Sequence, residues 1–539
     1  MKVSALISAL MDQKIRISLE GTDLAISAPE NVLTDAWVKL LVENKAPLIN
    51  YLQNLSDNTF NSIDRVPAGQ DYALSHSQRR MWIIGQLERG MGKTAYNISG
   101  CYAFEGHLDL NSLERALQAV MMRHESLRTV FITVNGEPRQ RILSAEEFGD
   151  ALNYEDLSGM DGSGDEVSSR VQSAAESGFD LSTGPLVRAY LLKVSAERYV
   201  FLLTLHHIIS DGWSMAVLVR ELLQLYNSYS SGIEDPLPPL RIHYRDYASW
   251  QNGLLSEGGL ESSRRYWHDQ LGGELPVLEL PSDYRRPDIK QNNGSQQSLL
   301  LPAAVNQALN EKSRSAGATL FMMLLSTVKV LLYRYTGQQD LIVGTAVAGR
   351  NHVDLEDQIG FYVNTLALRT QLEGDWDFDH LLSAVKEVTL GAFEHQQYPF
   401  DLLVDELSPD RNLGRMPVFD VLVVLQNVDI GGTGEPARGL DPVQVSEYET
   451  PGTVAKFDLT FNFQESPSGL LLEVEYSTDL FSSDRISRML SHYGQLVREV
   501  LRDSSQAIGR LDYLSASERE ELLSSFSHGA VTEYGDEDT

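Results

Sequence analysis

The sequence predicts a mixed α/β protein in three parts, a small αββαα unit followed by two larger lobes that each combine sheet and helices. Residues 199–205 are β-branched and apolar without alternation, which is typical of a strand buried on both faces. Residues 215–226 follow with apolar side chains at helical spacing. In the second half, an apolar helix over 319–335 precedes an apolar strand over 341–348. At 539 residues, the chain is also too long for one hydrophobic core.

The first unit covers residues 1–55 and begins with a short amphipathic helix. Residues 14–20 alternate between apolar and polar, a Gly-Thr-Asp turn follows, and residues 24–28 return as a second strand. Two further helices are expected over 33–43 and 47–55, the second with a proline in its first turn. So short a unit has a marginal core. A two-stranded hairpin also leaves open edges, which can bind a strand of another chain.

The rest of the chain divides where its composition changes. Residues 56–70 are polar and rich in turn formers, and they are predicted to be a linker. Residues 280–293, rich in proline, arginine and asparagine, are predicted to cross between the two lobes. We therefore expect a first lobe over 71–285, a second lobe over 286–520, and the start of a linker to a missing downstream domain over 521–539.

Further elements are expected within the lobes, in chain order. In the first lobe Ser75 opens a helix, and a strand over 102–106 and an amphipathic helix over 110–122 follow. The segment 242–250 leads into a helix that is expected to end near Trp267. The second lobe is expected to contain strands over 421–426, 458–464 and 471–477 and a helix over 483–501.

Composition excludes several classes of partner. The 44 basic residues against 75 acidic ones leave a net charge of −31, whereas nucleic acid and anionic membranes both require basic surface. Cys101 is the only cysteine, so neither an intramolecular disulfide nor a cysteine-based metal cluster is expected. The N-terminus turns polar before a signal-peptide core is complete, and no apolar run approaches the roughly 18 residues of a membrane span. We expect a cytoplasmic, monomeric protein.

The residues best suited to catalysis or ligand binding are concentrated in Leu205–Ser214, on the turn between the buried strand and the following helix. Such turns are a common place for a scaffold to expose reactive groups. Neighbouring side chains on a strand point to opposite sides, so His206 and His207 cannot share one role. For the same reason they do not chelate one ion, and no metal site is predicted. Taken singly, Asp211 could simply cap the helix and Gly212 could simply supply a tight turn.

Two other patterns give weaker evidence of a functional site. Gly92-Lys93-Thr94 could be mistaken for the end of a phosphate-binding loop, but the position where that loop needs its first glycine is Leu87. What precedes is predicted to be helix rather than strand, so we reject a P-loop. His124 and Arg128, taken alone, would be a helix-end cation and a member of a structural ion pair.

Seven motifs extend the pattern far beyond the central turn. In order from residue 74 to about residue 420 they are SHSQRRMW, RHESLRTVF, HHIISDGWS, YRDYASW, IGFYVNTLALR, HQQYPFDLL and RNLGRMPVF. In kind and order they resemble the condensation domains of nonribosomal peptide synthetases. The resemblance implies a V-shaped pair of lobes, each similar to chloramphenicol acetyltransferase. HHIISDGWS is most similar to members of the LCL type, which join an L-configured donor to an L-configured acceptor.

The resemblance also implies a reaction, the aminolysis of a thioester. A donor acyl or peptidyl group, held on the 4'-phosphopantetheine arm of an upstream carrier protein, is attacked by the amine of an aminoacyl group on a downstream carrier. His207 is the implied catalytic residue. His206 and Asp211 are implied to hold the turn, Asp211 by pairing with Arg350, and Gly212 to leave room for the arm. The family-motif positions expected near the site are Ser75, Gln78, Arg79, Arg123, His124, Arg128, Trp213 and Asn364.

The demand on His207 can be judged from the pKa of the nucleophile. An α-amine has a pKa of about 7.7–8.0, so roughly a tenth of it is neutral at pH 7, and supplying the free amine costs only about 1.4 kcal/mol. A strong base is therefore not required. We predict that His207 positions the amine and accepts its proton as the tetrahedral intermediate forms.

Residues 1–55 show a second resemblance, carried by their element order and by the pattern ISLEGTDLAISAPENVLT. They resemble N-terminal docking domains of the tubulysin type, whose hairpin binds the C-terminal segment of the preceding synthetase subunit. The alternative is a small cap packed permanently on the next domain. The hairpin positions expected to bind that segment are Lys14, Arg16, Ser18, Leu24 and Ile26.

Other functions remain to be weighed. The chain lacks a Gly-Gly-x-Ser carrier site, an adenylation-type phosphate loop and a Gly-x-Ser-x-Gly elbow, so we expect it to be the front of a larger subunit with a downstream adenylation domain. A starter domain that N-acylates an amino acid with a fatty acyl group is one alternative, and a non-catalytic module that recruits carriers is another. The intact HHIISDG motif favours an enzyme, and the docking segment favours tethered substrates over free coenzyme A thioesters.

Overall fold

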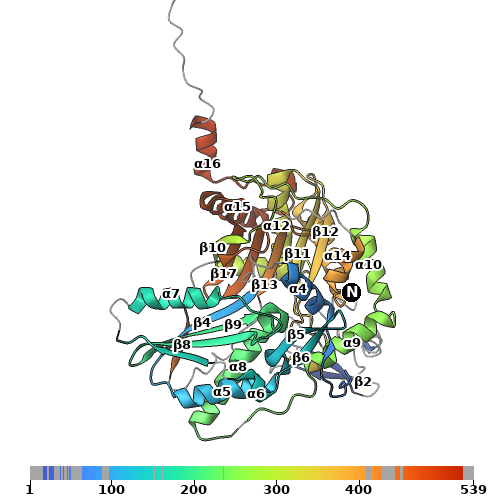
Figure 1. Ribbon diagram of the computed structural model, residues 1–539. Helices are drawn as coiled ribbons and strands as arrows, with labels where there is room; N and C mark the ends of the chain where they lie inside the picture. Colours follow the sequence, from blue (N-terminus) through green and yellow to red (C-terminus); the bar gives the residue numbers. More distant parts are fainter. Residues whose placement is uncertain are drawn as a thin grey trace, which may run out of the picture.

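The computed structural model describes residues 16–20, 23–28, 63–87, 96–149, 152–159, 163–234, 236–407, 414–426, 443–448 and 453–525, and a few single positions between 37 and 49. After the N-terminal hairpin, these residues form two α/β lobes that lie against each other (Figure 1). The predicted mixed α/β class and the division into two lobes are confirmed.

The N-terminal hairpin is present as predicted. Strand β1 (Arg16–Glu20) pairs with β2 (Asp23–Ser27) in antiparallel register, with Ile17 opposite Ile26. Lys14, the short first helix and most of the two following helices lie outside the described residues. The described positions within the ranges predicted for those two helices, among them Leu41 and Leu48, are helical and both of these leucines are buried.

The N-lobe is built on a five-stranded sheet in the order β14-β4-β9-β8-β7. Its central strand β9 (Arg198–His206) is buried on both faces, as the apolar run predicted. Phe201 and Leu203 belong to the core beneath helices α5 and α8, whereas Val200 and Leu202 pack with α7 on the opposite face (Figure 1). The other elements of this sheet layer are β4 (Asn97–Glu105), β7 (Leu152–Asp156), β8 (Val187–Ser195), α5 (Leu110–Arg123), α7 (Ser163–Ala175) and α8 (Gly212–Ser230).

Smaller elements complete the N-lobe. A three-stranded sheet in the order β3-β6-β5 packs beside helix α4, and the 3-10 turns η1 and η2 follow α5 and β9. Their bounds are β3 (Tyr72–Ala73), α4 (His76–Leu87), η1 (Glu125–Arg128), β5 (Thr129–Val134), β6 (Glu137–Ile142), α6 (Ala145–Phe148) and η2 (His207–Ile209).

One predicted helix is wrong in its extent. The segment expected to run on to Trp267 is two helices, α9 (Tyr244–Ser256) and α10 (Glu261–Leu271), separated by a turn. Gly258 in that turn has φ +77°, a left-handed conformation that glycine adopts without steric cost and that ends a helix. The apolar spacing continues through the turn, which is why periodicity alone merged the two helices.

The C-lobe carries a seven-stranded sheet in the order β12-β11-β13-β16-β17-β10-β15. Helix α12 (Leu320–Thr336) lies in its core, and every residue from Met322 to Leu332 is buried. The predicted strands β11 (Asp340–Val347), β13 (Val421–Gln426), β16 (Leu459–Ser466) and β17 (Gly469–Ser477) are confirmed within two residues. The remaining elements are β10 (Asn293–Pro302), α11 (Ala303–Ser315), η3 (Val353–Leu355), β12 (Asn364–Gln371), α13 (Phe378–Glu394), α14 (Phe400–Leu407), β15 (Thr453–Val454), α15 (Ser483–Arg502), η4 (Ile508–Arg510), α16 (Ala516–Glu520) and a last helical turn, Glu521–Ser525.

The chain joins the two lobes a second time through β14 (Gln444–Glu447), a strand the sequence did not predict. The strand comes from the part of the chain that otherwise forms the C-lobe. It pairs with β4 at the edge of the N-lobe sheet, with Val445 opposite Phe104. Val443 beside it is buried in the N-lobe core. The two lobes therefore share a sheet as well as an interface.

The end of the predicted linker is packed rather than free of contacts. Ile63 is fully buried in the N-lobe core, and the Val66 backbone N–H donates to Asp246 Oδ1 at 2.8 Å. Among the described residues, no single helix is long and apolar enough to cross a membrane, although the bent pair α11 and α12 passes the same test together.

Candidate active site at the lobe junction

His206 closes strand β9 and is used by the turn itself. Its Nδ1 accepts the Ile208 backbone N–H at 3.1 Å, and its ring meets Phe179 edge-on. Burial, together with the nearby Lys456 ammonium, lowers the pKa of His206 to about 4. A neutral histidine with one nitrogen committed to the backbone fits the structural assignment made from the sequence.

His207 faces the other way, toward the second lobe. Its backbone N–H donates to the Tyr96 carbonyl at 2.8 Å, and its ring lies 4.6 Å from the ring of Phe361 in the C-lobe. Within the described part of the chain, its buried Nδ1 has no hydrogen-bond partner. Burial and the Lys456 ammonium lower the pKa of His207, and the opposing effect of Asp211 is smaller. The imidazole is therefore neutral at pH 7 and able to accept a hydrogen bond.

Asp211 connects the two lobes. Its Oδ1 caps helix α8 by accepting the Ser214 backbone N–H at 2.8 Å and the Ser214 hydroxyl at 2.7 Å. Its Oδ2 accepts the backbone N–H groups of Tyr362 at 2.9 Å and Val363 at 3.2 Å, both from the C-lobe. The cap that a local interpretation would assign to Asp211 is thus real, but the carboxylate also accepts hydrogen bonds from the C-lobe.

Arg350 lies where the resemblance implied. Its Nη2 donates to Asp211 Oδ1 at 3.2 Å and to Ser214 Oγ at 2.8 Å, and its Nη1 donates to the carbonyls of Leu355 and of Gln358. Both members of the Asp211–Arg350 pair are only 2% exposed. The guanidinium also stacks 4.3 Å from the ring centroid of Tyr362.

Two glycines of the C-lobe allow this approach. Gly349 has φ +66°, and a side chain there would run into the Tyr362 carbonyl at 2.0 Å. Gly360 exchanges hydrogen bonds with Ser214, since its N–H donates to Ser214 Oγ at 3.0 Å and its carbonyl accepts from the same hydroxyl at 2.9 Å. Only glycine lets backbone come this close to the N-lobe turn.

Gly212 is required by neither packing nor backbone conformation. Its φ is not in the left-handed region, and a Cβ built on it meets no atom within 4 Å. The tight-turn interpretation of this glycine is therefore unsupported. The residue borders open space beside the His207 turn.

Helix α4 supports the turn from the side. Ser75 Oγ lies 2.8 Å from Tyr244 Oη, and that hydroxyl donates to the Phe361 carbonyl at 2.7 Å. Gln78 donates through Nε2 to the Ile208 carbonyl at 3.4 Å. Gln78 thus holds the backbone that follows His207, and Ser75 acts through Tyr244 on the Phe361 backbone of the C-lobe.

Other motif residues lie in separate places. His124 is buried with its Nε2 2.8 Å from Glu221 of α8, and Arg123 binds the same carboxylate at 3.1 Å. Burial lowers the pKa of His124. Arg128 donates to the Leu143 carbonyl at 2.5 Å. Arg123 and His124 thus contact helix α8, and Arg128 binds the backbone after β6. The lowered pKa of His124 does not fit a helix-end cation, and the hydrogen bond of Arg128 is to a carbonyl rather than to a carboxylate.

Arg79 is at the surface, where it pairs with Glu137 at 2.8 Å and is 55% exposed. Its expected place near the site is wrong, because the helical turn from Gln78 rotates the next side chain to the outside of α4. Its neighbour Arg80 instead reaches across the junction and pairs with Asp401.

Trp213 and Asn364 fix the C-lobe loops. Trp213 donates through Nε1 to the Glu356 carbonyl at 3.0 Å. Asn364 donates to the carbonyls of Gln396 at 2.8 Å and Tyr398 at 2.7 Å and accepts the Phe400 N–H at 3.0 Å. Asn364 thereby holds the YPFD segment in position.

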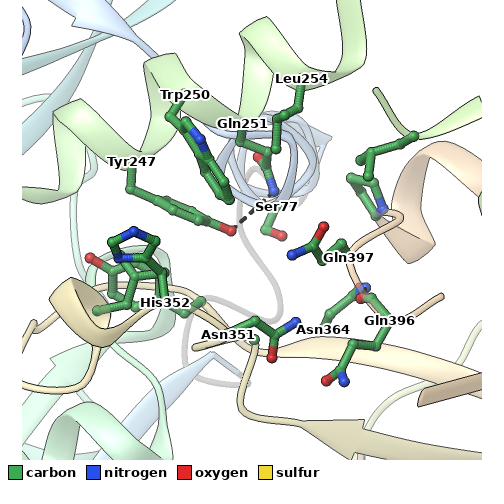
Figure 2. Close-up of a pocket in the computed structure, with 15 residues that line it drawn as sticks. Ser77, Tyr247, Trp250, Gln251, Leu254, Asn351, His352, Asn364, Gln396 and Gln397 are labelled. Atoms are coloured by element: carbon green, nitrogen blue, oxygen red, sulfur yellow. Dashed lines mark hydrogen bonds between the residues drawn. The ribbon is translucent and has the colours of Figure 1, made fainter. Parts of the chain in front are cut away.

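A cavity opens between the lobes next to these residues (Figure 2). Tyr247, Trp250 and Gln251 of α9 form one wall, and Gln251 donates through Nε2 to Tyr247 Oη at 3.1 Å. Asn351 and Asn364 of the C-lobe lie opposite them. The cavity is rich in amide side chains, and His207 is not among the residues that line it.

Some residues of the site were not found from the sequence. Lys456, Tyr96 and Phe361 surround His207, but a lone lysine or aromatic residue in an apolar stretch carries no local signal. The half-buried pair Arg80–Asp401 lies inside two quoted motifs, yet nothing in either motif indicates that they meet. No group of three or more metal-ligating side chains occurs in the part of the chain that the structure describes.

Comparison with known proteins places this geometry in a family. The Condensation domain family matches residues 68–523, and the TubC N-terminal docking domain family matches residues 3–54. Surfactin synthase subunit 1 of Bacillus subtilis is 38% identical over 488 residues, which are 90% of this chain and 13% of that protein. Tyrocidine synthase 3 of Brevibacillus parabrevis is 37% identical over 482 residues, which are 89% of this chain and 7% of that protein. This chain thus spans a small part of each of these synthetases.

Among solved structures, the X-domain from teicoplanin biosynthesis has a TM-score of 0.76 and 27% identity, covering 84% of this chain and 100% of that one. The family match covers most of the chain, and the HHIISDG turn lies where the two lobes meet. This protein therefore belongs to the condensation domains of nonribosomal peptide synthetases, a family of amide-forming acyltransferases, and it carries a TubC-type docking domain in front.

Proposed function

We propose that this chain forms a peptide bond between a donor acyl or peptidyl thioester on an upstream carrier protein and the amine of an aminoacyl thioester on a downstream carrier. The observation that carries the proposal is the intact turn at the junction. A neutral His207 faces the second lobe there, and Gly212 beside it borders open space. Both features suit a site that two long arms enter from different sides.

His207 is the catalytic residue of this proposal, acting as positioner and proton acceptor. Its lowered pKa makes it a weak base, which suits an amine that is already partly neutral at pH 7. As the amine attacks, a neutral imidazole can accept a hydrogen bond from it and then its proton. His206, Asp211 and Arg350 support the turn through the contacts described above. The 4'-phosphopantetheine is carried by the partner proteins.

The division of the chain follows the same proposal. A docking domain over 1–55 and a linker over 56–70 precede an N-lobe over 71–285 and a C-lobe over 286–520, and residues 521–539 begin a linker to a downstream domain. Packing departs from these bounds at two places, since Ile63 is buried in the N-lobe core and Trp267 of α10 is buried in the C-lobe core. The partners are the upstream carrier with the C-terminal docking segment of its subunit, and the downstream carrier with its adenylation domain. In the hairpin, Ile26 is 42% exposed, which leaves an apolar side chain for an incoming strand. We place the protein in the cytoplasm as a monomer of LCL type.

The direct test is a condensation assay read by mass spectrometry. The chain is mixed with a panel of donor-loaded and acceptor-loaded carriers, and the mass of the product that remains on the acceptor carrier is measured. We expect an amide with at least one aminoacyl or peptidyl donor. Product with fatty acyl donors alone would favour the starter alternative, and hydrolysis without amide for every pair would contradict the proposal.

Gly212 provides a second test, because its surroundings separate folding from channel blockage. Gly212→Leu is expected to lower the amide-forming rate by about tenfold or more, since the side chain would enter open space needed by the arm. The melting temperature should change little, because no protein atom lies within 4 Å of the added Cβ. Gly164→Leu, at a glycine in the first turn of α7 with equally open space, is the matched control. If Gly212→Leu is as active as the wild type, Gly212 does not keep space open for the arm.

A non-catalytic recruitment module is the second candidate. The likeness to the X-domain from teicoplanin biosynthesis favours it, since a related solved structure is a complex of that X-domain with OxyB. Against it, both histidines and Gly212 of the motif are present in this chain. The condensation assay distinguishes the two, because a recruitment module binds loaded carriers without joining their substrates.

A further inference from the structure

Lys456 lies at the His207 turn although it comes from the other lobe. It follows strand β15, which pairs with β10, and the neighbouring Ala455 N–H donates to the Asn292 carbonyl at 3.0 Å. The backbone of this segment therefore belongs to the C-lobe. Its side chain crosses to the N-lobe, where Nζ lies 5.4 Å from the ring centroid of Tyr96. The carbonyl of Tyr96 is the group that accepts the His207 N–H.

The surroundings of this ammonium are unusual for a lysine. Its charge acts on both His206 and His207, and burial lowers its own pKa. The carboxylate that faces it is Glu475 of β17, and the Tyr96 ring adds a cation–π contact. The Lys456 side chain is half-buried, and even partial burial of a cation is costly unless it is compensated. A cation retained beside the reactive histidine is therefore a candidate for function rather than for stability.

The chemistry of the junction needs a positive charge. When the amine nitrogen bonds to the thioester carbon, the carbonyl electron pair moves to oxygen and a negative charge develops there. When the intermediate collapses, the C–S bond breaks and the sulfur leaves as thiolate, which takes up the proton that His207 accepted. Fixed positive groups aimed at such developing charge commonly give the largest single contribution to catalysis. The other cation at the turn, Arg350, is committed to Asp211, Ser214 and two carbonyls.

We propose that the Lys456 ammonium, extended from the C-lobe over Tyr96 to the His207 turn, is the positive charge that stabilises the oxyanion formed on the donor thioester. This inference rests on the proposed condensation activity. It assigns the two lobes different tasks, with the N-lobe supplying the proton acceptor and the C-lobe supplying the charge. It also gives the meeting of the lobes a chemical purpose beyond enclosing the arms.

The test is the single-turnover rate of amide formation between loaded carriers from about pH 7 to about pH 10, with enzyme-free rates subtracted. Lys456→Met is expected to lose about 100-fold in rate at pH 7, with carrier binding unchanged. In the wild type the rate should fall at alkaline pH as Lys456 loses its proton. In Lys456→Arg that fall should disappear, because arginine stays protonated throughout.

A control variant has to lie outside the set of charged groups that act on His207 or Lys456. Those that act on His207 are Lys456, Asp211 and His206, and Glu475 acts on Lys456. Lys290 is a second lysine whose pKa burial lowers, but it lies 3.7 Å from Asp458 Oδ1. Lys290→Met should keep the wild-type pH profile.

The outcomes separate the two proposals. A wild type that forms no amide with any pair of carriers overturns both. An active wild type whose pH profile is shared by Lys456→Arg, or whose rate survives Lys456→Met, overturns only the role of Lys456. If Lys456→Met proves unstable, the comparison of Lys456→Arg with the wild type still decides the question.

Discussion

Replacement of His207 by alanine is expected to lower the rate of amide formation by about two to four orders of magnitude, the range that positioned proton transfer contributes. The loss comes from two sources. The acceptor amine is no longer held for attack, and no group takes its proton as the C–N bond forms. The measurement is the single-turnover rate with both carriers loaded, followed by mass spectrometry of the acceptor carrier.

The neighbouring histidine is the matched control. In His206→Asn the side-chain oxygen can still accept the Ile208 N–H that Nδ1 accepts in the wild type. We expect this variant to keep most of the rate, because His206 packs against Phe179 on the side away from the second lobe. Near-wild-type amide formation by His207→Ala would show that the assignment is mistaken. Equal losses in both variants would indicate a role of the turn as a whole.

Replacement of Asp211 by alanine is expected to destabilise the protein by about 3–5 kcal/mol, the cost of breaking a buried ion pair at one end. The change leaves the Arg350 guanidinium without its carboxylate at a position that is 2% exposed. It also leaves the backbone N–H groups of Tyr362 and Val363 without their acceptor. A buried donor without a partner is costly in itself. The measurement is thermal or urea-induced unfolding, and amide formation should be lost as well.

A second ion pair between the same two halves of the chain is the matched control. Arg220 and Asp357 lie 2.7 Å apart, but their side chains are 43% and 68% exposed. Asp357→Ala should therefore cost no more than about 1 kcal/mol. A double variant, Asp211→Ala with Arg350→Met, should recover part of the loss because the unpaired buried charge is gone. A normal melting temperature for Asp211→Ala would refute the structural role.

Local sequence was sufficient for elements whose signal lies within their own residues. Strand β9 was predicted because it is buried on both faces, which removes the alternation that a half-exposed strand shows. The hairpin of β1 and β2 was predicted because its alternation and its turn lie within a dozen residues. The break between α9 and α10 was missed because the apolar spacing continues across Gly258. Strand β14 was missed because its pairing with β4 is decided by residues far away in the chain.

The candidate site divides in the same way. The opposite orientations of His206 and His207 follow from the two-residue period of a strand, and the family resemblance supplied the reaction and the partner of Asp211. Three other features depend on how the lobes pack: Asp211 binds C-lobe backbone, Arg79 faces solvent, and Lys456 reaches the His207 turn. Arg350 meets Asp211 across 139 residues of chain. Contacts of that kind depend on how two independently patterned lobes pack, and short-range periodicity carries no information about that packing.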